Sequence, residues 1–355
     1  MGFIVKRRSL AGSSVHLSAP TPREDGQVTS RLAFQATAAV TAAISALGRS
    51  EDLRFSPGNG LLAIAGTKRD RCLVLRVKIE DGAGGLRVSA DDFLTLGSAG
   101  LRYPHGLDFI DDETLVFANR QGFVSIIRLP NGELGGRHCD GQEAKIIRGS
   151  LLARVKTPGS VAARPEANGL VSLLVCNNYA HRVTQHVVDP RAGYRLMESK
   201  VLFRRALKVP DGVALSHNGS WTAISSHDTH EVKLFATAGK EGRQAEAAGT
   251  LKGVDCPHGL RFTNDDRHLL VADAAAPVIH VFRRQTGWDG NHDVTRSAVV
   301  LDEETYLRGR HNPEEGGPKG IDIDRTGRVV AITCQEEPLA FFALREIIGE
   351  CPEGT

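Results

Sequence analysis

The chain of 355 residues carries a formal net charge of +2, and 24% of its residues are charged. Lys and Arg are spread along the sequence rather than clustered, which argues against nucleic acid or an anionic membrane as a partner. No run approaches the ~18 apolar residues of a membrane span, and the basic residues 6–8 precede no apolar signal core. We therefore expect a cytoplasmic protein without nucleic-acid or membrane partners, and the oligomeric state stays open.

The six cysteines indicate a reduced protein. They form no CxxC pair, and Cys176 and Cys334 lie inside apolar, strand-like runs, so most of them are expected to be free and buried. An even count leaves one disulfide bridge possible. The cysteines are Cys72, Cys139, Cys176, Cys256, Cys334 and Cys351.

The N-terminal region divides into a tail and an ambiguous apolar run. Residues 1–40 have the composition of a polar tail. The Ala-rich run from Leu32 to Leu47 favours a helix by propensity, whereas its position before the first repeat suits a strand over Thr41 to Leu47. Both interpretations stay open from the sequence.

A repeated turn decides the fold class. Four segments share a Pro-x-Gly-hydrophobic turn, and each continues as a short strand, a polar turn and a second strand, the pattern of a β-hairpin. These segments are Tyr-Pro-His-Gly-Leu at 103–107, Val-Pro-Asp-Gly-Val at 209–213, Cys-Pro-His-Gly-Leu at 256–260 and Gly-Pro-Lys-Gly-Ile at 317–321. Weaker copies occur at 157–161 and 50–53.

The spacing of the copies predicts an all-β, six-bladed β-propeller. The x positions are Glu51, His105, Gly159, Asp211, His258 and Lys319, separated by 54, 54, 52, 47 and 61 residues. A period near fifty with about four strands is the length of one propeller blade. We expect a propeller over residues 41–346, with blades starting near 50, 104, 158, 210, 257 and 318 and a C-terminal tail over 347–355.

Ring closure is assigned to the N-terminal side. The last unit supplies strands near 320–324, 328–334 and 339–344, with little sequence after them for a fourth. Closure removes the exposed sheet edges of an open array. We therefore expect Thr41 to Leu47 to complete the last blade.

The x residues form a predicted inner ring at the channel mouth. Pro fixes φ, Gly permits close approach of backbones, and x points at the opening. His105 then lies opposite His258, and Glu51 lies opposite Asp211. Two imidazoles and two carboxylates are a ligand set for a divalent ion, with Zn, Fe or Mn favoured over Ca. Glu51 would be a fourth ligand or the general base, and Lys319 would orient the substrate.

A second ring and one loop complete the predicted pocket. The second ring comes from the ends of the second strands, within an error of one residue. Its members are Thr67, Asn119, Asn178, His227, Asp273 and Cys334. Of these, Asn119, Asn178 and Asp273 are candidates to bind substrate, and His227 is a weaker catalytic candidate beside Asp228. The loop from Thr305 to Gly317 makes the longest repeat interval and should cover the opening, with Arg310 and His311 contributing to substrate binding.

The turn at 209–213 resembles the metal-binding Asp turn of the gluconolactonase and regucalcin family. Glu51 resembles the first-blade Glu of the same family, whose metal ligands occupy this x position. The family places an Asn ligand one blade before the Asp, where this chain has Gly159. The resemblance spans most of residues 50–345 at the level of blades and implies lactone hydrolysis at a metal ion.

The two Pro-His-Gly turns resemble those of NHL-type propellers, which include the peptidyl-hydroxyglycine lyases. Those lyases bind zinc through three His on alternate blades, whereas His105 and His258 belong to opposite blades. Together the two resemblances imply a metal-dependent enzyme that hydrolyses a lactone or ester of a small molecule, or performs a related lyase step. The alternative is a non-catalytic propeller that binds a protein or peptide on its top face.

Overall fold

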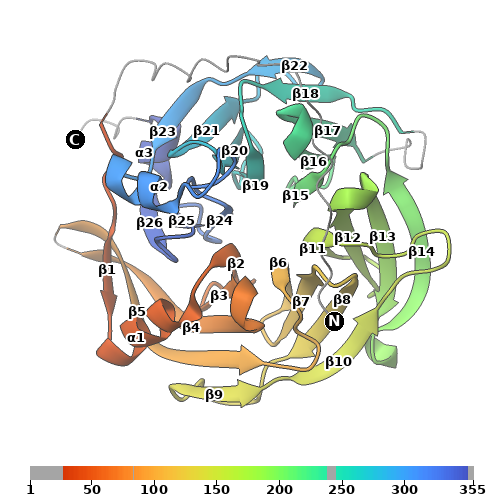
Figure 1. Cartoon of the computed structure of the whole chain (residues 1–355), viewed down its shortest axis with the longest axis horizontal. Coiled ribbons are helices and arrows are strands. Elements are labelled where there is room, and N and C mark those ends of the chain that lie inside the picture. The colour runs from red at the N-terminus through yellow and green to blue at the C-terminus, as the bar shows by residue number, and fades with distance from the viewer. Residues whose placement is uncertain (1–26, 83, 238–244, 351–355) are drawn as a thin grey trace.

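The computed structural model describes residues 27–82, 84–237 and 245–350, and they form a six-bladed β-propeller around one central axis (Figure 1). The innermost strands contact one another in sequence around the axis, and the last, β24, returns to the first, β2. The predicted fold class is confirmed. Among the described residues, no helix is both long and apolar enough to cross a membrane.

The blades are small antiparallel sheets that run outward from the axis. Blade 1 contains β2 (Ser50–Phe55), β3 (Leu61–Gly66), β4 (Arg71–Gly82) and β5 (Gly85–Gly97). Blade 2 contains β6 (Pro104–Asp111), β7 (Thr114–Asn119), β8 (Phe123–Arg128) and β10 (Gln142–Ile147). Blade 3 contains β11 (Pro158–Pro165), β12 (Val171–Asn177), β13 (Arg182–Asp189) and β14 (Arg195–Phe203).

The second half of the ring is built in the same way. Blade 4 contains β15 (Pro210–Leu215), β16 (Trp221–Ser226), β17 (Glu231–Ala236) and β18 (Gly249–Lys252). Blade 5 contains β19 (Pro257–Phe262), β20 (His268–Asp273), β21 (Val278–Arg283) and β23 (Arg296–Val299). Blade 6 contains β24 (Gly320–Ile323), β25 (Val329–Thr333) and β26 (Ala340–Ala343), and α3 (Leu344–Ile348) follows it.

Two further strands connect neighbouring blades. β9 (Arg137–Asp140) follows β8 of blade 2 but pairs in parallel with β5 of blade 1. β22 (Gly290–Asp293) follows β21 of blade 5 but pairs in parallel with β18 of blade 4. Each connection therefore returns to the outer edge of the preceding blade.

The hydrophobic core is divided into six clusters, one between each pair of adjacent blades. A second strand such as β7 is covered on both faces, so all of its residues are buried. This explains why the second strands read as continuous apolar runs rather than as alternating patterns. Cys72, Cys176, Cys256 and Cys334 are buried and free, and Cys139 is half-buried and free. Cys351 lies outside the described residues.

The N-terminal closure differs from the predicted one. Thr41 to Leu47 belongs to helix α1 (Ala38–Leu47), whose N-cap Thr37 accepts a hydrogen bond from the amide of Val40 at 3.2 Å. The high helix propensity of the Ala-rich run and this cap decide for the helix. Ala33–Ala36, expected in a polar tail, forms β1 and pairs in parallel with β5.

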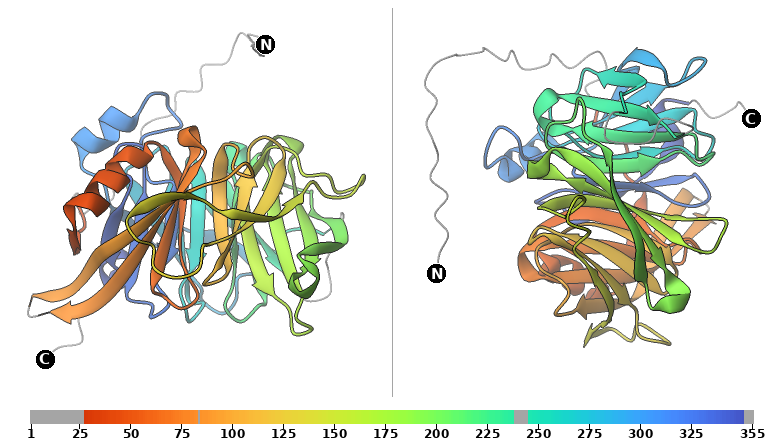
Figure 2. Two further views of the ribbon diagram at one scale, coloured as in Figure 1. Left: turned by 90° about the horizontal axis from the view of Figure 1, so that it is seen from below. Right: turned by 90° about the vertical axis from the view of Figure 1, so that its right-hand side faces the viewer.

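The last blade is instead completed by residues just before β1. Arg31 forms an antiparallel bridge with Phe342, and the amide of Leu32 donates to the carbonyl of Phe341 at 2.8 Å. The closing segment therefore lies at Arg31 and Leu32 and continues directly onto blade 1. Helices α1 and α2 (Glu303–Gly309) rise from the same face of the ring (Figure 2).

The Pro-x-Gly glycines are required because neighbouring turns nearly touch at the axis. A Cβ on Gly106 would lie 2.5 Å from the Cα of Ser160, and one on Gly212 would overlap the carbonyl oxygen of His258. Neither glycine has a positive φ, so close approach rather than backbone freedom selects Gly there.

Gly212→Ala should therefore destabilise the fold. The added methyl group overlaps a backbone oxygen, and such overpacking costs roughly 1–3 kcal/mol. The control is Gly60→Ala, because nothing lies within 4 Å of a Cβ there. Guanidinium unfolding of both variants measures the effect, and equal midpoints for the two would contradict this account.

A candidate metal site at the channel mouth

A β-bulge at the entry turn of blades 1 to 5 directs the x residue toward the axis. The strand pairing shifts register between Pro104 and Gly106, and again between Pro210 and Val213. A bulge leaves one residue out of the ladder and turns its side chain. In three of the turns the residue before Pro has a positive φ, at Tyr103, Thr157 and Val209.

Glu51, His105 and His258 form a buried cluster at this point. One ligand atom from each of the three residues lies within 4.8 Å of the other two. The Oε2 atom of Glu51 lies 3.6 Å from the Nε2 atom of His105 and 3.8 Å from the Nε2 atom of His258. The two imidazole centroids are 5.3 Å apart. The structure thus brings the two predicted histidines together across the axis.

Asp211 belongs to the same group. Its Oδ2 atom lies 3.3 Å from the Nε2 atom of His258, and its Oδ1 atom accepts a hydrogen bond from the Nδ2 atom of Asn178 at 2.7 Å. Asn178 follows β12 and brings an amide to the carboxylate. Asp211 therefore borders the cluster through His258, and the three ligand atoms that lie within 4.8 Å of one another belong to Glu51, His105 and His258.

Backbone carbonyls of the next blade orient both imidazoles. The Nδ1 atom of His105 is 2.8 Å from the carbonyl oxygen of Gly159, and the Nδ1 atom of His258 is 3.2 Å from that of Lys319. A carbonyl only accepts hydrogen bonds, so each Nδ1 atom carries the proton and each Nε2 atom keeps a lone pair. This is the outer-sphere arrangement that holds His ligands at metal ions.

Burial keeps both imidazoles neutral. It lowers the pKa of His105 to about 3, aided by Arg120 and opposed by Glu51 and Asp211. Burial likewise lowers the pKa of His258, against the opposing charges of Asp211 and Glu51. Neutral imidazole is the form that binds a cation.

Cations hold the two carboxylates ionised. Burial raises the pKa of Glu51, but ion pairs outweigh this, Lys319 foremost, and the pKa lies well below its usual range. Burial also raises the pKa of Asp211, but the contacts with His258 and His105, the charge of Arg120 and the hydrogen bond from Asn178 outweigh this, and the pKa lies below its usual range. The Oε2 atom of Glu51 is buried, and it lies 3.1 Å from the Nζ atom of Lys319. A buried carboxylate oxygen in that position is suited to a cation.

A ring of alternating charges surrounds Glu51 at the rim. Arg49 bonds both Glu51 and Glu315, the latter at 2.8 Å. The Nζ atom of Lys319 lies 3.1 Å from the Oε2 atom of Glu51 and 3.7 Å from Glu315. The loop after α2 therefore reaches the site through Glu315. Arg310 and His311 of this loop are exposed, and Arg310 packs over the ring of Tyr306.

The second ring is displaced by one residue in two blades. Asn119 and Asp273 pair with Pro104 and Pro257, and their side chains accept hydrogen bonds from the amides of Arg102 and Cys256. They brace the entry turns, and substrate binding by them stays a prediction.

Of the residues that follow the second strands, Arg120 contacts His105 and Asn178 bonds Asp211 at the channel mouth. The residues that follow these strands are Arg120 after Asn119, Asn178 after Asn177, His227 after Ser226 and Ala274 after Asp273. Asn178 and His227 were predicted at these positions. Arg120 was not predicted, although it is adjacent to Asn119. Arg49, which bonds Glu51, was also missed, because the blade 1 turn lacks Pro and Gly and its boundary could not be read.

A layer of buried ion pairs lies beneath the ring. Arg54 pairs with Asp52, and the Nε atom of Arg261 donates to Asp322 at 2.7 Å. A cavity of about 10 Å³, room for roughly one water molecule, separates this layer from His105 and His258. Burial raises the pKa of Asp52 to about 6, against the opposing charge of Arg54.

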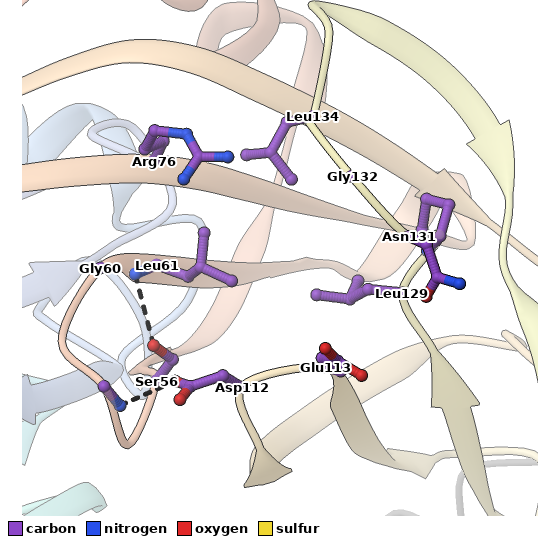
Figure 3. A pocket seen from close by; sticks show the side chains of 12 residues that line it. Ser56, Gly60, Leu61, Arg76, Asp112, Glu113, Leu129, Asn131, Gly132 and Leu134 are labelled. Atoms are coloured by element: carbon purple, nitrogen blue, oxygen red, sulfur yellow. Dashed lines mark hydrogen bonds between the residues drawn. The ribbon is translucent and has the colours of Figure 1, made fainter.

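A larger recess lies between blades 1 and 2, away from this cluster. It has a volume of about 300 Å³ and is lined by Leu61, Arg76, Glu113 and Leu134 among others (Figure 3). Ser56 and Asp112 at its base bond the backbone of the blade 1 hairpin. The recess contains no histidine or cysteine, so metal chemistry is assigned to the channel mouth.

The buried imidazoles should make stability depend on pH between 6.5 and 5. In this window the unfolded chain protonates His105, ordinarily with a pKa of 6.5, while the folded chain does not. Because the unfolded state then binds more protons, stability is full above pH 6.5 and falls with decreasing pH. His105→Gln should reduce the slope of the unfolding free energy against pH by up to about 1.4 kcal/mol per pH unit. Denaturant unfolding at several pH values, in the presence of a chelator, measures this slope. An unchanged slope would contradict the assignment, and the exposed His217→Gln is the control.

Comparison with known proteins gives similarity in fold alone. No protein-family model and no curated protein matches the sequence. A solved candidate gluconolactonase is 12% identical, with a TM-score of 0.52 over 83% of this chain and 89% of its own. A functionally unknown protein from Desulfotomaculum acetoxidans is also 12% identical, with a TM-score of 0.52 over 83% and 82% of the two chains. A candidate 6-phosphogluconolactonase from Bacteroides uniformis is 14% identical, with a TM-score of 0.52 over 80% and 78%. The chain is thus similar in fold to propellers solved as candidate lactonases.

Proposed function

We propose that this protein is a metal-dependent enzyme that hydrolyses a lactone or ester of a small molecule at the channel mouth. The observation that carries the proposal is the convergence of the Nε2 atoms of His105 and His258 with the buried Oε2 atom of Glu51. The similarity in fold to candidate gluconolactonases supports the choice of reaction.

His105, His258, Glu51 and Asp211 would hold the ion. Two imidazole nitrogens and two carboxylate oxygens suit Zn, Fe or Mn better than Ca, which prefers oxygen ligands alone. A bound ion would polarise the substrate carbonyl and lower the pKa of a coordinated water.

Glu51 is assigned as a ligand rather than as the general base. Its Oε1 atom accepts a hydrogen bond from Arg49, while its Oε2 atom faces both imidazoles and lies 3.1 Å from the Nζ atom of Lys319. The carboxylate is therefore oriented with one oxygen toward the ion and the other toward the rim.

His227 is the proposed general base and acid. It directly follows β16, and its Nδ1 atom lies 3.5 Å from the Oδ1 atom of Asp228. Water attacks the carbonyl carbon and gives a proton to His227. The bond from that carbon to the leaving oxygen then breaks, and the proton passes to the leaving oxygen, which yields an acid and an alcohol.

Lys319 and Asn178 are proposed to orient the substrate. The buried ammonium of Lys319 lies beside Glu51 and would stabilise negative charge that develops on the carbonyl oxygen. The Oδ1 atom of Asn178 is buried without a hydrogen-bond partner in the described part of the chain, and a substrate hydroxyl could donate to it.

The purified protein should contain one divalent ion per chain. A His105→Ala, His258→Ala double variant removes both nitrogen ligands and should lose the ion, while His217→Ala, an exposed histidine of the opposite face, should keep it. Elemental analysis measures this. A native protein without metal, which also binds none on addition, would favour a propeller that only binds a partner.

Turnover of lactones and esters should require both the ion and His227. Chelator should abolish it, and His227→Asn should lower kcat by roughly 10²–10⁴-fold. The metal content of His227→Asn should stay that of the wild type, because His227 is not a ligand. Full activity in that variant, or activity that survives chelation, would refute the mechanism.

A further inference from the structure

Arg120 contacts two of the proposed ligands. Its Nη2 atom lies 2.7 Å from the Nε2 atom of His105 and 3.7 Å from the Oδ1 atom of Asp211. The Nη1 atom is buried and has no hydrogen-bond partner among the described residues, and 25% of the Arg120 side chain is exposed. The guanidinium thus lies between the ligands and the mouth.

Arg120 and a metal ion compete for one lone pair. The Nδ1 atom of His105 donates to Gly159, so its Nε2 atom has a single lone pair, which accepts from Arg120 in this structure. That lone pair cannot also coordinate an ion, and two cations a few ångströms apart repel strongly in a buried site. An ion bound to His105 must therefore displace the guanidinium.

The displaced guanidinium is suited to bind an anion. Its partly exposed position lets it turn toward the mouth, where it offers a planar fork of donors to a carboxylate or phosphate. Lys319 contacts Glu51 on the other side of blade 1, and an ion on the Oε2 atom of Glu51 competes with that contact too. Two cations then flank the space above the ligands.

We infer that Arg120 occupies the ligand nitrogen of His105 until a divalent ion takes it, and then binds an anionic group of the substrate. This inference rests on the proposed function and narrows its substrate class to lactones or esters that carry a carboxylate or phosphate. Arg120 thereby acts in specificity rather than in the bond-breaking step.

Titration of Zn²⁺ into chelator-treated protein, followed by calorimetry, tests whether Arg120 competes with a divalent ion for His105. Arg120→Met removes the competitor and should tighten Zn²⁺ binding about tenfold, the value of one hydrogen bond to a charged group. Arg120→Lys keeps the positive charge but lacks the planar set of guanidinium donors. It serves as a second, conservative variant in case Arg120→Met does not fold. The control is Arg164→Met, since Arg164 is 26% exposed and pairs with Glu166 in blade 3. Unchanged or weaker Zn²⁺ binding in Arg120→Met overturns the inference.

Titration of acetate and methyl phosphate into the Zn²⁺-loaded proteins tests whether the displaced Arg120 binds an anionic group. The wild type and Arg164→Met should bind one of these anions at least tenfold more tightly than Arg120→Met. The preferred anion distinguishes carboxylate from phosphate. Equal anion affinity in Arg120→Met overturns the specificity role and leaves the proposed function standing. A wild type that binds none of Zn²⁺, Fe²⁺ and Mn²⁺ overturns the proposed function itself.

Discussion

Contact between successive entry turns at the axis is the constraint on which this structure depends. In four of the turns a glycine brings the backbone of one blade against the turn of the next, at Gly106, Gly212, Gly259 and Gly320. In two blades an imidazole adds a hydrogen bond to the carbonyl of the neighbouring turn. The same contact closes the ring and fixes the tautomer of each histidine. Ring closure and ligand geometry therefore cannot be separated in this chain.

Charge balance is the second theme of the channel. Glu51 and Asp211 are buried beside neutral imidazoles, and Arg49, Lys319 and Arg120 compensate them from the rim. Buried carboxylates without such partners would be strongly destabilising. The compensating cations are also the groups that a metal ion would disturb. A site of this kind couples ion binding to the arrangement of its own rim.

The sequence repeat predicts most of the fold and many of the residues of the candidate site. The spacing of the Pro-x-Gly turns identifies six blades, and the x positions identify the four proposed ligands and Lys319. The closing segment was misplaced because Thr41 to Leu47 is apolar in either conformation, and the cap at Thr37 becomes decisive only with coordinates. Arg120 was missed because the sequence cannot show which of two adjacent residues braces a turn and which faces the channel. Glu315 pairs with Arg49 across 266 residues, a contact with no local signal.

The parallel strands β9 and β22 give the ring a mechanical property that its repeat alone lacks. Each is encoded after one blade and hydrogen-bonded to the blade before it. β1 does the same across the chain terminus, since it pairs with blade 1 while Arg31 and Leu32 bond blade 6. A linear array of repeats can lose terminal units one by one. Here the segments around β9, β22 and β1 tie blade 2 to blade 1, blade 5 to blade 4 and blade 6 to blade 1, so separating either blade of such a pair also disrupts the sheet of its neighbour.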